Sequence, residues 1–208
     1  MAAISLQGLN PFLRKLPIWL VWILGLLPLA WVIWLVVSGG IGVDPIKEIE
    51  HRLGKIGLWF LLGGLTITPL RRIFELNLLR FRQAIGLLAF FYITLHMLIW
   101  LSLDMGFLWG QILQDLTRRP YLIFGMISAV LLLPLALTSN QAAIRKLGRG
   151  WGRLHRLVYP AVLLAVVHYL WQMKVIRPEG WIWLGALLLL LALRLFWRKK
   201  RASRPAQG

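Results

Sequence analysis

The sequence predicts an all-α integral membrane protein, built as a bundle of about six transmembrane helices. Two observations predict this fold class. First, 59% of the 208 residues are hydrophobic and only 15% are charged, and the mean hydropathy is +0.73. Second, the apolar residues form long blocks rather than an amphipathic pattern, and such blocks are stable in a bilayer rather than in water. The expected helices cover about residues 16–37, 56–70, 84–103, 121–137, 157–173 and 181–197.

The blocks differ in how their ends are marked. The first is too long for the apolar core of a cleaved signal peptide and lacks a small-residue cleavage site, so we expect it to remain as a helix. The second is short, and we expect Pro69 to end it. Residues flanking the apolar block must therefore join the helix for it to be long enough to cross the bilayer. Residues 1–15 and the basic tail 198–208 then flank one transmembrane domain, 16–197, because no connection exceeds about 20 residues.

The basic residues predict the orientation. Of the 24 Lys and Arg residues, 17 fall on the side of the N-terminus and seven on the opposite side. Cytoplasmic segments of membrane proteins carry the excess of basic residues, so we expect both termini to be cytoplasmic. The net charge of +17 is therefore a topology signal and not a sign of nucleic-acid binding. The seven outer residues are Lys47, Arg52, Lys55, Arg118, Arg119, Lys174 and Arg177.

Several kinds of site are excluded by composition. The chain has no cysteine, which removes thiolate metal sites, iron–sulfur clusters and covalent haem attachment. The cluster Gly148, Gly150 and Gly152 lacks the preceding strand of a dinucleotide site, so we interpret it as a flexible basic loop. Redox chemistry would therefore need a histidine-ligated or noncovalent cofactor.

Two of the four histidines are expected at one depth in the membrane. His96 lies about 18 Å and His168 about 17 Å from the cytoplasmic ends of their helices, at 1.5 Å of rise per residue. Two imidazoles from different helices at one depth are what an axial pair on one haem iron requires. The alternative is that each histidine only hydrogen-bonds a neighbouring helix. An unpartnered imidazole in a bilayer is costly, so either interpretation gives both residues a partner.

The other two histidines are expected near the membrane surfaces. His155 lies at the cytoplasmic mouth of its helix, about 20 Å from His168. At its depth the third helix offers Arg82 and Gln83, which are not usual iron ligands, so His155 could serve a second haem, a quinone or a flavin, or be an interfacial residue. Arg82 and neighbouring arginines could pair with haem propionates or a flavin phosphate. His51 is expected to be a solvated loop or helix-start residue.

Three stretches resemble a known family. These are DPIKEIEHRLGKIGLWFLLGGLTITPLRRI, LRFRQAIGLLAFFYITLHMLIWL and LGRGWGRLHRLVYPAVLLAVVHYLW. They resemble the MsrQ family of haem-binding membrane subunits, part of the ferric-reductase-like transmembrane superfamily. The resemblance covers about Gly8 to Arg198. It implies haem b bound by His96, His155 and His168, a noncovalent FMN, and electron input from the quinone pool or a cytoplasmic flavin reductase.

The resemblance also implies a function and a partner. The chain would be an electron-transfer subunit in the bacterial inner membrane. Catalytic reduction of methionine sulfoxide in oxidised proteins would occur on a periplasmic molybdopterin-containing subunit, MsrP. One alternative is a stand-alone quinol or metal reductase of the same superfamily. Another is a small six-helix transporter, which is disfavoured because none of the seven acidic residues lies clearly mid-membrane.

Overall fold

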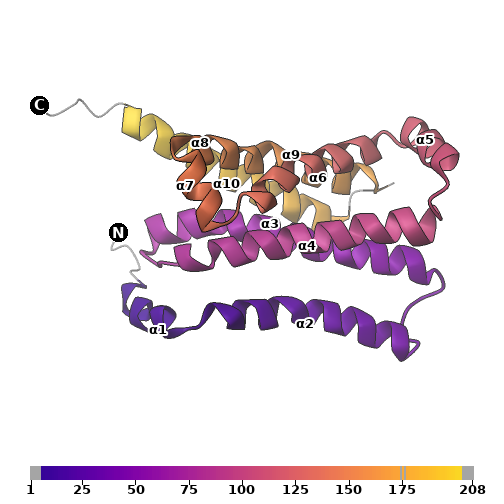
Figure 1. Cartoon of the computed structure of the whole chain (residues 1–208), viewed down its shortest axis with the longest axis horizontal. Helices are drawn as coiled ribbons and strands as arrows, with labels where there is room; N and C mark the ends of the chain where they lie inside the picture. The colour runs from indigo at the N-terminus through magenta and orange to yellow at the C-terminus, as the bar shows by residue number, and fades with distance from the viewer. Residues whose placement is uncertain (1–5, 174, 176, 203–208) are drawn as a thin grey trace, which may run out of the picture.

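The computed structural model describes residues 6–173, 175 and 177–202, and within these residues the chain is helical with no strand. The long helices form a bundle, and α1 and the C-terminal end of α10 lie at the same end of it (Figure 1). The elements are η1 Gln7–Leu9, α1 Asn10–Lys15, α2 Ile18–Val37, α3 Pro45–Ile73, η2 Leu79–Phe81, α4 Arg82–Ile99, the π-helical η3 Trp100–Asp104, α5 Trp109–Arg118, α6 Tyr121–Leu137, α7 Gln141–Leu147, α8 Arg149–Leu154, η4 His155–Leu157, α9 Val158–Trp171 and α10 Pro178–Ala202.

The expected all-α membrane bundle is confirmed. Five helical segments among the described residues are long and apolar enough to cross a membrane, and α6 makes a sixth when it is counted with α5 as one broken span. The spans are α2, α3, α4 with η3, α6, α9 with its preceding turns, and α10. Many large apolar side chains point outward along these helices, as lipid contact requires. The chain is a multi-pass membrane protein.

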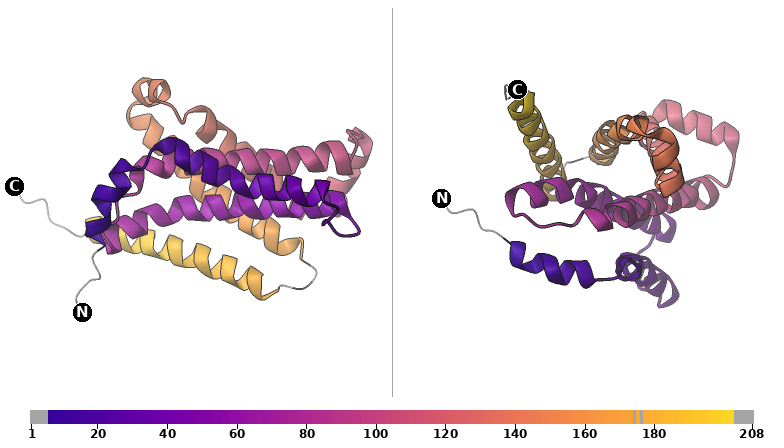
Figure 2. Two further views of the ribbon diagram at one scale, coloured as in Figure 1. Left: turned by 90° about the horizontal axis from the view of Figure 1, so that it is seen from below. Right: turned by 60° about the vertical axis from the view of Figure 1, so that its left-hand side comes forward.

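Two helix pairs form the centre of the bundle. Helix α3 packs along α4, and α6 packs along α9; α2 lies against α3 and α4, and α10 contacts both α3 and α9 (Figures 1 and 2). The largest buried cluster brings α3, α6, α9 and α10 together around residues such as Leu62, Val162 and Leu187. The seam between the two pairs is where the histidine-lined cavities described below are found.

The prediction that Pro69 ends the second span is wrong. Helix α3 continues through Pro69 to Ile73 and begins at Pro45, well before the apolar block. Proline lacks an N–H, so the carbonyl of Leu65 loses its helical partner. The guanidinium of Arg194 on α10 donates to that carbonyl at 2.6 Å, which satisfies it inside the membrane. The proline is therefore tolerated within the helix.

Helix α2 is fixed to the bundle by one tyrosine of α4. The hydroxyl of Tyr92 donates to the carbonyl of Gly25 at 2.7 Å and accepts from the N–H of Leu29 at 3.1 Å. These are the two backbone groups that would bond each other in an uninterrupted helix. Gly25 also packs closely on Leu88, where a β-carbon would lie 2.3 Å from a side-chain methyl. The absence of a side chain at Gly25 permits this close helix crossing.

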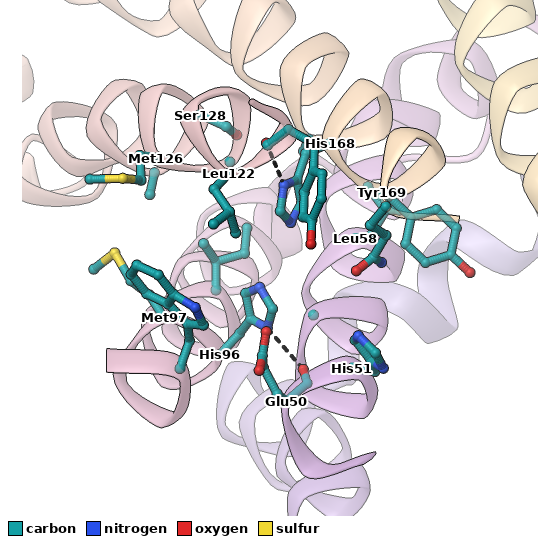
Figure 3. Close-up of a pocket in the computed structure, with 18 of the residues that line it drawn as sticks. Glu50, His51, Leu58, His96, Met97, Leu122, Met126, Ser128, His168 and Tyr169 are labelled. Carbon is teal, nitrogen blue, oxygen red and sulfur yellow. Dashed lines mark hydrogen bonds between the residues drawn. The ribbon is translucent and has the colours of Figure 1, made fainter. Parts of the chain in front are cut away.

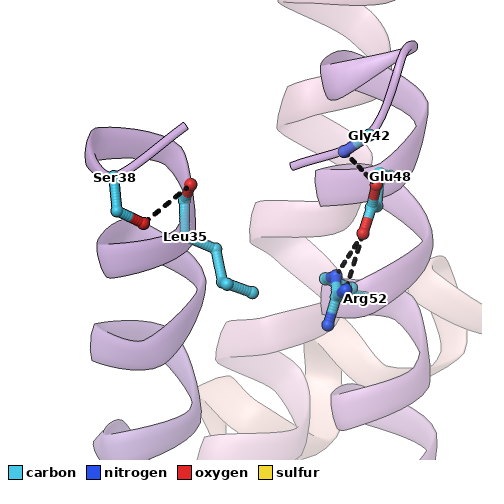
Figure 4. Close-up of polar contacts among 5 residues, drawn as sticks. All are labelled: Leu35, Ser38, Gly42, Glu48 and Arg52. Atoms are coloured by element: carbon cyan, nitrogen blue, oxygen red, sulfur yellow. Dashed lines mark hydrogen bonds and ion pairs between the residues drawn. The ribbon is translucent and has the colours of Figure 1, made fainter. Parts of the chain in front are cut away.

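The turn between α2 and α3 is closed by a glycine cap and an ion pair. Gly39 has φ +70°, and the N–H of Gly40 donates to the carbonyl of Leu35 at 2.9 Å, which ends α2. Glu48 accepts from the N–H of Gly42 and pairs with Arg52 at 2.6 Å (Figure 4). These contacts tie the turn to the first two turns of α3.

The connections are more ordered than the sequence analysis expected. The basic loop interpreted as flexible forms the short helices α7 and α8, which meet at Gly148 with φ +49°. The indole N–H of Trp151 donates to the carbonyl of Thr138 at 2.9 Å and fixes α8 to the end of α6. The connection after the third span contains α5, which was not predicted. It lies at the opposite end of the bundle from α7 and α8 (Figure 1).

Candidate functional site

The site is built around two histidines from different helices. His96 on α4 and His168 on α9 have ring centroids 6.2 Å apart, with 68° between the ring planes. They lie within a cavity of about 270 Å³ lined by residues of α3, α4, η3, α6 and α9, which we call the outer cavity. The two residues expected at equal depth on different helices are brought together by the folded bundle, with their rings edge to face across the seam.

Each of these two rings hydrogen-bonds a backbone carbonyl on a neighbouring helix. The Nδ1 of His96 hydrogen-bonds the carbonyl of Glu50 at 2.8 Å, and the Nδ1 of His168 hydrogen-bonds the carbonyl of Tyr121 at 2.8 Å. A carbonyl only accepts, so Nδ1 carries the proton in both rings. The lone pair is then on Nε2, and Figure 3 shows this second nitrogen of each ring facing the other ring.

A glycine allows each ring to reach its carbonyl. Gly54 lies four residues after Glu50, and a β-carbon there would be 3.1 Å from Nδ1 of His96. Gly125 lies four residues after Tyr121, and a β-carbon there would be 2.8 Å from Nδ1 of His168. Any side chain would push the ring away from the helix that it leans on. The sequence analysis missed both glycines, because their role depends on which helices become neighbours.

Polar groups gather where the outer cavity approaches the end of the bundle. His51 and Glu50 on α3 line it there, with Asp104 from the end of η3 and Arg119 after α5 (Figure 3 shows the first two). His51 is exposed and stands in the second turn of α3, as expected of a solvated residue near a helix start. The pKa of the Asp44 carboxyl, which caps α3, is lowered by hydrogen bonds from Lys47.

A second cavity lies beside the outer one in the same seam. It has a volume of about 220 Å³ and is lined by Arg82, Gln83 and His155, as the sequence analysis expected from their depth. We call it the inner cavity. Leu61 lines both cavities, so they adjoin.

The His155 ring is stacked and partly satisfied. It lies on the indole of Trp151 with centroids 3.9 Å apart, and its Nδ1 bonds the Trp151 carbonyl at 3.2 Å. Its Nε2 is buried and has no hydrogen-bond partner among the described residues. His155 begins the 3₁₀ turn η4, which directly precedes α9. A buried imidazole nitrogen with a lone pair can act as a metal ligand or a hydrogen-bond acceptor.

Comparison with known proteins identifies the family. A family profile described as "Ferric reductase like transmembrane component" matches residues 53–166. The chain is 41% identical over 193 residues to a protein of Agrobacterium fabrum, covering 93% of this chain and 90% of that protein. It is 42% identical over 207 residues to a protein of Brucella anthropi, covering 99% and 94%, and 42% identical over 202 residues to one of Rhizobium meliloti, covering 94% of each. All three are named "Protein-methionine-sulfoxide reductase heme-binding subunit MsrQ".

The chain belongs to the MsrQ family. The profile match places this MsrQ chain within the ferric-reductase-like group, and it includes His96 and His155 but ends two residues before His168. The curated relatives extend over nearly the whole chain. No solved structure matches this chain. The resemblance on which the sequence analysis relied is therefore confirmed at the level of family and fold.

Proposed function

We propose that this chain is a haem b electron-transfer subunit of a protein-methionine-sulfoxide reductase system. The observation that carries the proposal is the pair His96 and His168, whose Nε2 atoms face each other across the outer cavity. The names of the MsrQ relatives, which describe haem-binding subunits, support the same assignment.

The separation of the two rings fits a shared iron. A metal–imidazole bond is about 2 Å long, and the ring centre lies roughly 1 Å beyond the nitrogen, so two coaxial rings on one metal have centroids about 6 Å apart. The observed separation is 6.2 Å. The described residues contain no group of three or more His, Cys, Asp or Glu that could hold a metal ion. Two histidines alone suit a metal whose remaining ligands belong to a cofactor, as the iron of haem is held by its porphyrin.

The protein's own hydrogen bonds set the orientation of both rings. The carbonyls of Glu50 and Tyr121 fix the tautomer of His96 and His168 and set the rotation of each ring. Haem bound there would supply a one-electron carrier, and two neutral imidazole ligands favour electron transfer over binding of a small molecule. Apolar residues such as Ile93 and Leu58 also line the cavity, beside the polar groups at its outer end.

We further propose that the inner cavity holds a second redox group at the cytoplasmic side. His155 offers an unpartnered Nε2, and Arg82 offers a guanidinium that forms no ion pair with a described acidic residue. This pair suits a planar cofactor with an acidic group, either a second haem b, the FMN implied by family resemblance, or a quinone head. Because Leu61 lines both cavities, a group in one would lie close to a group in the other.

The direction of electron flow follows from the proposed orientation. With both termini cytoplasmic in the bacterial inner membrane, electrons enter at the inner cavity from the quinone pool or a cytoplasmic flavin reductase. They leave at the outer face to the periplasmic molybdopterin-containing subunit MsrP, which would form a heterodimer with this chain. The reduction of methionine sulfoxide would take place on that partner.

The visible spectrum of the purified protein tests the haem assignment. The wild-type chain should copurify with b-type haem that shows a low-spin spectrum. His96→Ala and His168→Ala should each remove most of that signal, and His51→Ala, a histidine at the same cavity without a facing partner, should retain it. Full wild-type haem content and spectrum in both of the first two variants would show that the pairing is wrong.

A further inference from the structure

Helix α5 crosses the end of the bundle instead of continuing a span. Its axis turns 111° from that of α6, with a break at the intervening Arg119–Pro120 segment. Because α6 packs along the candidate span α9, α5 runs roughly along the membrane surface at the end farthest from α7 and α8 (Figure 1). A ten-residue helix in this position is anchored by its neighbours or by lipid.

One side of α5 packs against the bundle. Ile112 is 5% exposed and belongs to a small buried cluster with Trp100 and Met105, against which Leu116 also packs. Trp100 lines the outer cavity, so this contact places α5 directly behind the cavity wall. Asp115 and Arg119 form an ion pair at 3.3 Å, and Arg119 lines the cavity at its polar end.

A second side of α5 is apolar and uncovered. Leu113 is 65% exposed and Trp109 is 66% exposed, and these two residues are one helical turn apart. Phe107 and Leu108, which lead into the helix, are 50% and 60% exposed. The remaining side carries Gln111, Gln114 and Arg118. The helix therefore has an apolar edge and a polar face, and we name Phe107, Leu108, Trp109 and Leu113 the α5 edge.

Continuity with the lipid-facing surface indicates what covers the α5 edge. Leu103, at the end of the preceding span, is 52% exposed and leads directly into this segment. Tryptophan is enriched where a protein passes through the headgroup region of a bilayer, and helices that lie in this region carry Trp, Phe and Leu on their apolar face. Arg118, at the C-terminal end of α5, is exposed and suits contact with lipid phosphates.

We propose that α5 is an interfacial helix whose edge inserts into the headgroup–acyl boundary of the membrane leaflet at this end of the bundle. Lipid then holds α5 from one side while Ile112 holds it from the other. The consequence is that the wall at Trp100 and the guanidinium of Arg119 are kept at the outer cavity by a helix seated in lipid. This proposal does not depend on which cofactor the cavity holds.

The lack of cysteine makes a direct test possible in the full chain. Single-cysteine variants W109C, L113C, Q111C and Q114C would carry a nitroxide label in liposomes of phosphatidylethanolamine and phosphatidylglycerol. Power saturation compares collisions with oxygen, which concentrates in lipid, and with a neutral nickel chelate, which stays in water. V130C, on the lipid-facing side of α6, marks the membrane interior, and V43C, in the exposed α2–α3 turn, marks water at the same end of the bundle.

The expected result is a pattern that alternates with the helix face. Labels at positions 109 and 113 should collide several-fold less with the nickel chelate than the label at 43, with an oxygen-to-nickel ratio between those at 43 and 130. Labels at 111 and 114 should resemble the label at 43. If the label at 113 collides with nickel as often as the label at 43, the edge faces water and is available to a soluble partner, and the proposal is overturned.

Discussion

The Nη2 of Arg194 donates a hydrogen bond to the carbonyl oxygen of Leu65 at 2.6 Å, across the contact between α10 and α3. Pro69 removes the N–H that would otherwise occupy this carbonyl. The same guanidinium lies 5.3 Å from the ring centre of Tyr159. A charged residue inside a membrane segment is thus used to complete the hydrogen bonding of a helix that a proline has interrupted.

A double-mutant cycle follows from this relationship. Arg194→Met should destabilise the detergent-solubilised protein by about 1–3 kcal/mol, the cost of an unsatisfied buried carbonyl. Pro69→Ala restores the N–H, so Arg194→Met should cost less in that background. Thermal unfolding followed by circular dichroism measures all four variants. Arg72→Met, which removes an arginine that lies over Trp197, is the matched control. Equal losses with and without the proline would contradict the explanation.

The two glycines behind the histidines predict a second set of variants. Gly125→Ala places a β-carbon 2.8 Å from Nδ1 of His168, and Gly54→Ala places one 3.1 Å from Nδ1 of His96. Both should reduce haem content or alter the low-spin spectrum, and Gly125→Ala should have the larger effect because its contact is shorter. Gly63→Ala is the control, since nothing lies within 4 Å of a β-carbon there. The difference spectrum of dithionite-reduced membranes measures the effect, and the idea fails if the control loses as much haem.

The sequence could predict the spans and the histidine pair, but not the backbone that supports them. The equal depth of His96 and His168 followed from helix rise alone, because both helices start at the same membrane surface. Gly54 and Gly125 gave no signal of their own, since the role of a glycine between helices depends on which neighbour packs there. Pro69 was misinterpreted for the same reason, because its compensating donor, Arg194, lies on another helix.

Helix α5 was missed for a different reason. Its apolar residues Trp109, Ile112, Leu113 and Leu116 do follow helical spacing. The segment is short and stands between two longer apolar blocks, so its pattern alone does not distinguish it from a loop. Its direction, across the end of the bundle, depends on the packing of Ile112 against Trp100 and Met105 and not on local sequence.

We expect Tyr92 of α4 to contribute strongly to holding α2 against the bundle. Tyr92→Phe removes the hydroxyl that bonds both Gly25 and Leu29, while the ring still packs on Phe60. The loss of a buried hydroxyl with two partners should cost about 1–3 kcal/mol of stability and leave the haem spectrum unchanged. Thr66→Val, which removes a hydroxyl bonded to Gly63 within the same helix, should cost less. Protease cleavage in the α2–α3 turn offers a second measurement, and unchanged stability would show that the tyrosine does not hold α2.

The proposed orientation is tested by reporters at the C-terminus. With both ends cytoplasmic, an alkaline phosphatase fused after Gly208 should be inactive, because it folds only in the periplasm, and a fluorescent protein that folds only in the cytoplasm should be bright. A phosphatase fused within the exposed α2–α3 turn, at Val43, should be active. The opposite pattern would reverse the orientation and, with it, the assignment of the inner and outer cavities.

The last prediction separates electron entry from electron exit. If electrons enter beside His155, then His155→Ala should slow haem reduction by a quinol in membrane vesicles by about tenfold or more, since it removes the buried nitrogen that faces the inner cavity. Reoxidation of the reduced haem by the periplasmic partner with methionine sulfoxide present should change much less, because the outer cavity and its histidine pair remain intact. Stopped-flow absorbance at the haem Soret band follows both steps in the same vesicles.

Arg156→Ala, which removes an adjacent basic residue that does not line the cavity, should leave both rates near wild type. If His155→Ala slows the two steps equally, the inner cavity is not the entry site. A haem that never reoxidises with partner and methionine sulfoxide present would leave the chain as an electron carrier with a different acceptor.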